Sequence, residues 1–274
     1  MNTALITGSS SGFGRLTADT FFAKGWNVAA TMRRPDISKG PPGSSRMAVL
    51  RLDVTDNSSI EAALADCISR FGTIDVLVNN AGYGLHAMFE QSSEDSIRRI
   101  FETNVFGTMN VTRAVLPHMR RQGSGRIINV TSMGGIFGVP GNAAYSATKF
   151  AIQGLTEALA LEYANWGIEV KSVLPGAFSR TGFARNAENL TLEGESQLSE
   201  HSRKLREFLT RQMNQGNAQD PQVVADKIFL CATQNTPTHN PAGEDAEATI
   251  ELMNLLPTHQ HFLDAIRQRF LPST

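Results

Sequence analysis

Two side chains with acid–base chemistry, Tyr145 and Lys149, lie four residues apart in a stretch whose apolar residues recur at helical spacing. Residues at this spacing project from the same face of a helix. A phenol has a reference pKa of about 10, and a neighbouring ammonium group stabilises its ionised form. Tyr145 can therefore give a proton in a reduction and take one in an oxidation. By itself the pair is more typical of an exposed tyrosine beside a solvated lysine, so the other motifs decide its meaning.

Two further polar residues come before this pair in the chain. Ser132 follows the apolar run Ile127 to Val130, and its hydroxyl can hold and polarise a substrate oxygen. Asn104 lies within a stretch that reads as a helix from Ile97 to Met119. Asparagine is mildly unfavourable inside a helix, so we expect Asn104 to make a local hydrogen bond.

A glycine-rich turn follows the first apolar run and precedes a helical pattern. Such a turn lets backbone amides approach a pyrophosphate, and the helix N-terminus adds a partial positive charge. The spacing is GxxxGxG and not GxGxxG, and an ordinary strand-to-helix turn is the alternative. The candidate ligand residues are Gly8, Ser10, Ser11, Gly12, Phe13 and Gly14.

The residues after the second and third apolar runs bear on the adenosine end of a dinucleotide. Arg33 and Arg34 stand where an acid usually holds the ribose of NAD, and guanidinium groups bind a 2'-phosphate, so NADP(H) is favoured over NAD(H). They are otherwise solvated loop charges. Asp53, followed by Val54, is interpreted as a helix cap or as a partner of the adenine amino group, although Asp56 can equally be the cap.

Two more motifs follow later apolar runs. Asn79, Asn80, Ala81 and Gly82 combine two amides that can bridge strands with two small residues beside which a flat ring could lie. Those amides can also simply brace the sheet. Pro175-Gly176 follows the sixth run.

The elements that must position these motifs alternate regularly between strand and helix. Continuous apolar runs are typical of strands covered on both faces, and helical patterns such as Arg15 to Lys24 and Ser58 to Phe71 separate them. This alternation predicts an α/β fold with a doubly wound parallel sheet, in which ligands lie beyond the carboxyl ends of the strands. The predicted strands are Ala4 to Thr7, Val28 to Thr31, Ala48 to Leu52, Ile74 to Val78, Ile127 to Val130 and Val170 to Leu174.

From residue 3 to about residue 185 the chain resembles the short-chain dehydrogenase/reductase family. The motifs that carry this resemblance occur in order along the chain: the glycine turn, Asn79-Asn80-Ala81-Gly82, Asn104, Ser132, Tyr145-xxx-Lys149 and Pro175-Gly176. The resemblance implies a Rossmann-type fold and a nicotinamide cofactor. It also implies that Asn104, Ser132, Tyr145 and Lys149 form a catalytic tetrad in which Asn104 holds a proton-relay water. The basic pair after the second strand is similar to that of NADP-preferring members.

The later chain is similar to the family only in part. Many members carry a threonine five residues after the proline of the Pro-Gly turn, and it contacts the nicotinamide amide. Here that position is Arg180, so Ser179 and Thr181 are the alternatives. We predict no glycine-rich seventh strand. Residues 238–246 are instead similar to those of 17-beta-hydroxysteroid and retinol dehydrogenases, which favours lipophilic substrates.

We expect one domain over residues 1–274, with a substrate lid at 177–219 and a C-terminal extension at 235–274. Within the lid segment, Leu198, Leu205 and Phe208 recur at helical spacing, together with Leu209 and Met213. A surface helix that packs on the core is the alternative to a lid. Loops 83–89 and 133–142 carry apolar side chains and are expected to line a mostly apolar pocket.

Composition narrows the range of partners. The chain has 25 basic and 26 acidic residues, which argues against a nucleic acid or an anionic membrane as partner. Two isolated cysteines and the lack of an N-terminal signal pattern favour the cytoplasm. His259 and His261 lack the further ligands that a metal needs, so no metal is expected. The family resemblance favours a homodimer or homotetramer, with contacts through the helices around Asn104 and Tyr145.

The leading hypothesis is an NADP(H)-dependent oxidoreductase that interconverts a hydrophobic ketone or aldehyde and its alcohol, with Tyr145 as proton donor. One alternative is a non-catalytic protein that senses dinucleotides, although such a protein has no need of an intact Ser132, Tyr145 and Lys149. The other is a non-redox enzyme on the same scaffold, such as an epimerase or dehydratase.

Overall fold

The apolar runs form one parallel sheet in the computed structural model, which describes residues 1–35, 44–178, 188–189, 200, 202–205, 207 and 219–270. The strands are β1 (Thr3–Ile6), β2 (Asn27–Met32), β3 (Met47–Arg51), β4 (Val76–Asn79), β5 (Leu85–His86), β6 (Gly125–Val130), β7 (Ile168–Pro175), β8 (Glu188–Asn189) and β9 (His239–Ala242). The α-helices are α1 (Gly12–Ala23), α2 (Asn57–Phe71), α3 (Glu94–Phe101), α4 (Gly107–Gln122), α5 (Ala143–Glu162), α8 (Gln222–Thr233), α9 (Glu244–Leu255) and α10 (His259–Phe270). Short 3-10 helices cover Phe89–Gln91, Met133–Gly135 and Ala164–Trp166, and a π-helical segment covers Glu102–Phe106.

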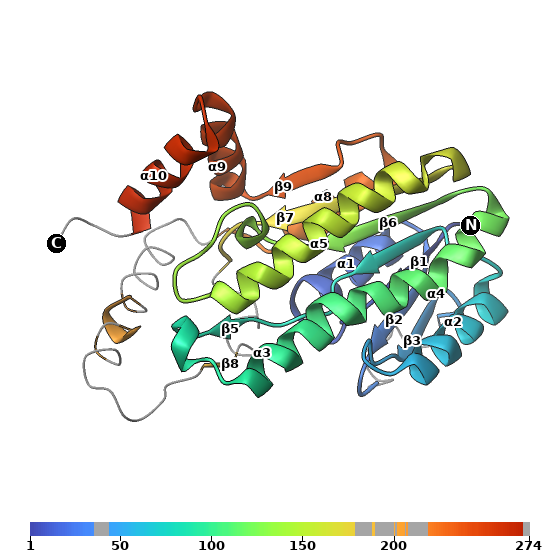
Figure 1. Ribbon diagram of the computed structural model, residues 1–274. Helices are drawn as coiled ribbons and strands as arrows, with labels where there is room; N and C mark the ends of the chain where they lie inside the picture. Colours follow the sequence, from blue (N-terminus) through green and yellow to red (C-terminus); the bar gives the residue numbers. More distant parts are fainter. Residues whose placement is uncertain are drawn as a thin grey trace.

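The strand order of the main sheet is β3-β2-β1-β4-β6-β7-β9, and every neighbouring pair is parallel. The chain builds outward from β1 in one direction and then, from β4, in the other. This reversal leaves a switch point between β1 and β4, where the connections after the two strands diverge. Figure 1 shows the sheet with α2, α4 and α5 across its front.

Alternate strand residues face two separate cores. Leu5, Ala29, Leu77 and Ile127 pack beneath α2 and α4, whereas Ala4, Ile6, Val28 and Val78 pack against α1 and α8. Both faces of the sheet are therefore buried, and the strands show no alternation of polar and apolar residues.

The doubly wound parallel sheet and its Rossmann-type arrangement are confirmed, and each of the six predicted strands is present with its ends within two residues of the prediction. The sequence does not predict β9, the seventh strand of the main sheet. It pairs with β7 over only four residues, one of which is Pro241, so it lacks the long apolar run of a central strand. An edge strand tolerates such a proline.

The helix expected from Ile97 to Met119 is also divided. The π-helical segment Glu102–Phe106 separates α3 from α4 and carries Asn104. A π-helical turn inserts one extra residue into a helix, and such segments occur often at functional sites.

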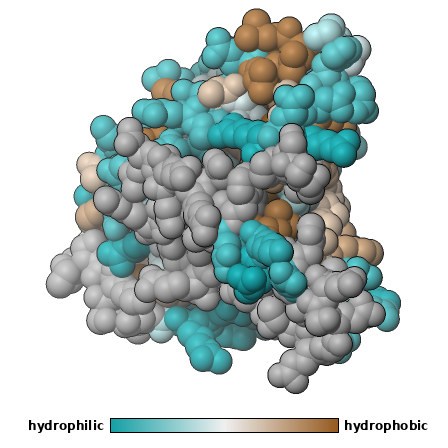
Figure 2. Space-filling model, turned by 90° about the vertical axis from the view of Figure 1, so that its left-hand side faces the viewer, coloured by the Kyte–Doolittle hydropathy of each residue, from teal (hydrophilic) through white to brown (hydrophobic). Residues whose placement is uncertain are grey.

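Helices α9 and α10 stand beyond the end of β9, at the upper left of Figure 1. Phe262 and Ile266 of α10 pack with Met133, Phe137 and Leu174, so these helices are anchored beside the carboxyl ends of β6 and β7. Figure 2 views the molecule from the left-hand side of Figure 1 and shows apolar side chains at its top, level with α9 and α10. In the part of the chain that the structure describes, no helix combines the length and the apolar character that crossing a bilayer requires.

Candidate active site

The motifs singled out in the sequence meet at one edge of the sheet. Because β1, β4, β6 and β7 are neighbouring parallel strands, their carboxyl ends lie at the same edge. The backbone registers place Ile6 beside Val78 and Val130 beside Val173. The glycine turn, the Asn-Asn-Ala-Gly segment, Ser132 and the Pro-Gly turn therefore all leave the sheet on one side.

The glycine turn has the backbone geometry of an anion cradle. Gly8 and Gly12 adopt φ values of +69° and +55°, which residues with a Cβ rarely adopt. A Cβ at Gly14 would collide with the carbonyl oxygen of Gly8. Ser11 precedes α1 and makes no side-chain cap, which leaves the first amides of the helix open to an anion. These residues fit the pyrophosphate of a dinucleotide.

Asn80 braces this turn from the neighbouring strand end. Its side-chain amide donates to the carbonyl oxygens of Thr7 (2.9 Å) and Gly8 (3.2 Å). In return, the Thr7 hydroxyl accepts from the backbone amides of Asn80 and Ala81, each at 3.0 Å. These contacts show that the Asn80 side chain braces the end of the sheet, where it joins the loop after β4 to the glycine turn.

Ser132, Tyr145 and Lys149 come together at the next strand end. The hydroxyl groups of Tyr145 and Ser132 are hydrogen-bonded. The ammonium nitrogen of Lys149 donates to the carbonyl oxygen of Val130 at 3.0 Å and lies 5.6 Å from the centre of the Tyr145 ring. Tyr145 and Lys149 are both 9% exposed, so neither is a solvated surface residue.

Burial moves the pKa values of these two groups in opposite directions. It raises the pKa of Tyr145 to about 12, and the hydrogen bond with Ser132 offsets only part of that effect. It lowers the pKa of Lys149 to about 8. In the chain alone, the expected lowering of the phenol pKa by Lys149 is therefore not found, because desolvation disfavours both charged forms. Tyr145 is held as a proton donor through the neutral range.

Asn104 ties the loop after β4 to α5. Its side chain accepts from the backbone amide of Tyr83 (3.1 Å) and donates to the carbonyl of Tyr83 (2.9 Å) and to the hydroxyl of Thr148 (3.2 Å). A Cβ at Gly82 would lie 3.0 Å from the Asn104 side-chain oxygen and 3.9 Å from the Lys149 nitrogen. Asn104, Gly82 and Lys149 thus border one small space, and the hydrogen bonds of the Asn104 side chain are not local but join segments 21 and 44 residues away in the sequence.

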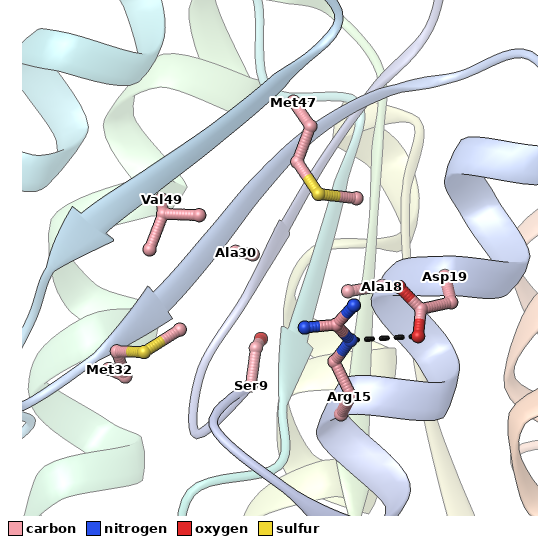
Figure 3. A pocket seen from close by; sticks show the side chains of 8 residues that line it. All are labelled: Ser9, Arg15, Ala18, Asp19, Ala30, Met32, Met47 and Val49. Atoms are coloured by element: carbon pink, nitrogen blue, oxygen red, sulfur yellow. Dashed lines mark hydrogen bonds and ion pairs between the residues drawn. The ribbon is translucent and has the colours of Figure 1, made fainter. Parts of the chain in front are cut away.

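The adenosine end of the expected cofactor site lies at the end of β2. Arg33 and Arg34 are exposed directly after this strand. A nearby recess, shown in Figure 3, is lined by Ser9, Arg15, Ala18, Asp19, Ala30, Met32, Met47 and Val49. Arg15 lies in this recess, with its guanidinium 2.8 Å from the Asp19 carboxylate. Arg15 is not among the site residues predicted from the sequence. It directly follows Gly14 and brings a third cation to the region.

Asp53 does not cap a helix. Asp56 is the cap of α2, since its carboxylate accepts from the amides of Ser58 and Ser59. The Asp53 carboxylate instead accepts from the amide and the hydroxyl of Thr55. The neighbouring Val54 is buried against Gly107, where a Cβ would collide with it.

The Pro-Gly turn follows β7 and continues into Phe178. The rings of Phe178 and Phe13 meet edge to face with their centres 5.3 Å apart, which joins this turn to the glycine turn. Ser179, Arg180 and Thr181 lie outside the described residues, as does most of segment 177–219.

The sequence profile of the short chain dehydrogenase family matches residues 2–190 of the chain. The chain is a short-chain dehydrogenase. It is 42% identical over 193 residues to a 3-ketodihydrosphingosine reductase of Bacteroides thetaiotaomicron, covering 70% of each chain. It is 36% identical over 247 residues to rat (Rattus norvegicus) estradiol 17-beta-dehydrogenase 1, covering 83% of this chain and 69% of that protein. The resemblance drawn from the motifs is confirmed.

Similar solved structures agree with this assignment. A member from Streptomyces avermitilis matches with a TM-score of 0.80 and 38% identity, over 98% of this chain and 94% of its own. ElxO with NADP bound matches with a TM-score of 0.75 and 25% identity, over 90% and 99% of the two chains. A 3-ketoacyl-(acyl-carrier-protein) reductase from Brucella melitensis, complexed with NADH, matches with a TM-score of 0.73 and 28% identity, over 88% of this chain and 96% of its own. This short-chain dehydrogenase is therefore an oxidoreductase of a family that binds nicotinamide cofactors.

Proposed function

We propose that this short-chain dehydrogenase reduces a ketone or aldehyde of a hydrophobic small molecule with NADPH, by a reaction that is reversible. One observation carries the proposal. The buried phenol of Tyr145 is hydrogen-bonded to Ser132 and lies beside Lys149, at the sheet edge where the glycine turn begins. A proton donor, a polarising hydroxyl and a cation thus share one site with an anion cradle.

The glycine turn and the N-terminus of α1 would hold the pyrophosphate, and Ala81 and Gly82 leave room for the nicotinamide end. When bound, the cofactor supplies the hydride. Tyr145 gives its phenolic proton to the substrate oxygen while the Ser132 hydroxyl orients that oxygen. The Lys149 ammonium then stabilises the phenolate that remains. In the reverse direction Tyr145 takes up the proton.

The choice of NADP(H) rests on charge. Arg33 and Arg34 are exposed after β2, and Arg15 lies in the adjoining recess. Guanidinium groups form paired, charge-assisted hydrogen bonds with a phosphate. Together they favour a cofactor with a 2'-phosphate, such as the NADP of the ElxO structure, over NADH.

A lipophilic substrate is favoured by the walls of the site. Leu85 and Phe137 are buried in the loops that flank Ser132 and Tyr145. Segment 177–219 touches these loops at two described points. The backbone of β8 pairs with β5, and Leu205 lies 3.6 Å from where a Cβ of Gly141 would stand. These contacts support the proposal that the segment covers the substrate, and the names of the two curated relatives denote lipophilic substrates.

The test is Tyr145→Phe, assayed with NADPH and a panel of ketones and aldehydes by loss of nicotinamide absorbance. Removing the proton donor should lower kcat by about 10²–10⁴-fold. NADPH affinity, measured by fluorescence titration, should stay within about threefold, because the ring itself is retained. Turnover near the wild-type value in the variant would refute the role of Tyr145. Wild-type protein that binds NADPH but consumes none across the panel would refute the reductase.

A further inference from the structure

The carboxylate of Asp245 holds the turn that follows β7. One of its oxygens accepts from the backbone amide of Ala177 at 2.7 Å. The other accepts from the side-chain amide of Gln219, also at 2.7 Å. The Gln219 amide in turn approaches the Ala177 carbonyl at 3.5 Å, and its oxygen accepts from the Glu244 amide at 2.7 Å. Ala177, Asp245 and Gln219 therefore form a closed ring of hydrogen bonds.

Asp245 also packs directly on the turn. A Cβ at Gly176 would collide with the Asp245 carboxylate, so the glycine is required because the carboxylate occupies that space. Asp245 belongs to the first turn of α9, where the helix N-terminus stabilises a negative charge. Helix α9 is itself anchored to the core, since Ala246 packs with Leu174 and Phe262. The turn is thus fixed to a rigid element that lies far away in the sequence.

The turn and the strand before it contact both halves of the candidate site. On one side, Phe178 contacts Phe13 of the glycine turn. On the other, Thr131, the neighbour of Ser132, donates to the carbonyl oxygen of Val173 from its amide (2.8 Å) and its hydroxyl (3.1 Å). A nicotinamide bound between the glycine turn and Tyr145 would therefore lie near this turn.

We propose that Asp245 is a positioning residue for hydride transfer. It holds the Pro175-Gly176-Ala177 turn in the position that the nicotinamide requires. This inference rests on the proposed function. Asp245 touches neither substrate nor cofactor in this scheme and acts through the backbone of the turn. Small displacements of reacting groups are costly, because catalysis depends on their alignment. Loss of the Asp245 carboxylate should therefore slow the chemical step more than it weakens cofactor binding.

The experiment compares Asp245→Ala, Asp245→Asn and Glu247→Ala in single turnovers at saturating NADPH and substrate. The rate reports the chemical step, and the amplitude reports the fraction of competent protein. We expect Asp245→Ala to lower the rate by at least about tenfold at near-normal amplitude, with NADPH affinity changed less than about threefold. Asp245→Asn keeps an acceptor for the Ala177 amide and should recover most of the rate. Glu247→Ala breaks an exposed ion pair of the same helix with Lys227 and should match the wild type.

A reduced amplitude with an unchanged rate in Asp245→Ala would overturn the proposal, because it would show a purely structural role. A wild-type rate and amplitude would overturn it as well. Hydrogen exchange of the Ala177 amide gives a readout that needs no turnover. Protection present in the wild type and lost in Asp245→Ala supports the positioning role, whereas equal protection refutes it. A protein that reduces no carbonyl would contradict the proposed function, and this exchange measurement would still show whether Asp245 holds the turn.

Discussion

At the scale of single residues, the reactive centre depends on two groups that burial affects in opposite ways. The high pKa of Tyr145 keeps its proton in place, and the lowered pKa of Lys149, about 8, brings the loss of its ammonium charge close to neutral pH. A buried phenol without a cation would be a poor acid, because its phenolate would be left without stabilisation. The protonated lysine is therefore the form that supports reduction.

The pH profile of reduction follows from this argument. The protonated form of Lys149 exists below its pKa, so kcat/KM for reduction should be flat below pH 8 and should fall as the pH rises through about 8. The measurement is kcat/KM against pH, which reports ionisations of the free enzyme. Lys149→Met should be slower and should lose this inflection. An inflection that persists in Lys149→Met would assign it to another group.

The proposed choice of NADP(H) also rests on individual side chains. Under the proposed NADP(H) assignment, replacing both Arg33 and Arg34 by alanine would remove two charge-assisted hydrogen bonds to the 2'-phosphate, each worth about 1.5–3 kcal/mol. The preference for NADPH over NADH, measured as the ratio of kcat/KM values, should fall at least about tenfold. Arg98→Ala is the matched control, because Arg98 pairs with Glu94 on the exposed face of α3. An unchanged ratio in the double variant would contradict the NADP(H) assignment.

At the scale of elements, the glycine turn and α1 work as one unit with the end of β4. Gly14 lies inside α1, and a methyl group there would collide with Gly8 and with the side chain of Asn80. The substitution should therefore displace both the turn and its brace, and with them the anion cradle.

Gly14→Ala is expected to lower the free energy of unfolding by about 1–3 kcal/mol, as overpacking does. It should also weaken NADPH binding, measured by fluorescence titration. Gly138→Ala offers a control in the loop after Gly135, where a Cβ would meet nothing within 4 Å. At that exposed position alanine should stabilise the protein by about 0.4–1 kcal/mol, measured by denaturant unfolding. Normal NADPH binding by Gly14→Ala would refute the cradle.

At the scale of the whole molecule, α4 and α5 cover one face of the sheet and present apolar side chains outward. Phe106, just before α4, and Phe150 and Leu161 of α5 are 47%, 44% and 82% exposed. Exposed apolar surface of this kind is typical of an interface, and symmetric association is the common arrangement for soluble oligomers. We expect these helices to pair with a second copy of the chain.

The prediction is tested by light scattering after gel filtration. Wild-type protein should elute as a dimer or tetramer, and Phe150→Glu with Leu161→Glu should shift it to a smaller species, because charges would be buried at the contact. Leu255→Glu in α9, at a residue 74% exposed, serves as the control and should leave the assembly unchanged. A wild-type monomer would contradict the prediction.

The sequence alone supported the sheet, because strands buried on both faces leave continuous apolar runs that local reading detects. It missed β9, whose four residues carry no such run, and the π-helical segment at Asn104, which periodicity cannot separate from the flanking helices. Asp53 and Asp56 show a similar limit. Both are acids before a helix, and only the backbone geometry assigns the cap to Asp56.

For the site, residue types and spacing were sufficient to nominate Ser132, Tyr145 and Lys149, because proton transfer restricts the side chains that can serve. Only the tertiary structure decided how these groups are tuned. The phenol pKa rises because Tyr145 is buried among groups distant in the sequence, so the expected effect of its neighbour does not dominate. Arg15 and Asp245 could be connected to the site only after folding, since a recess and a ring of hydrogen bonds join residues that no local pattern relates.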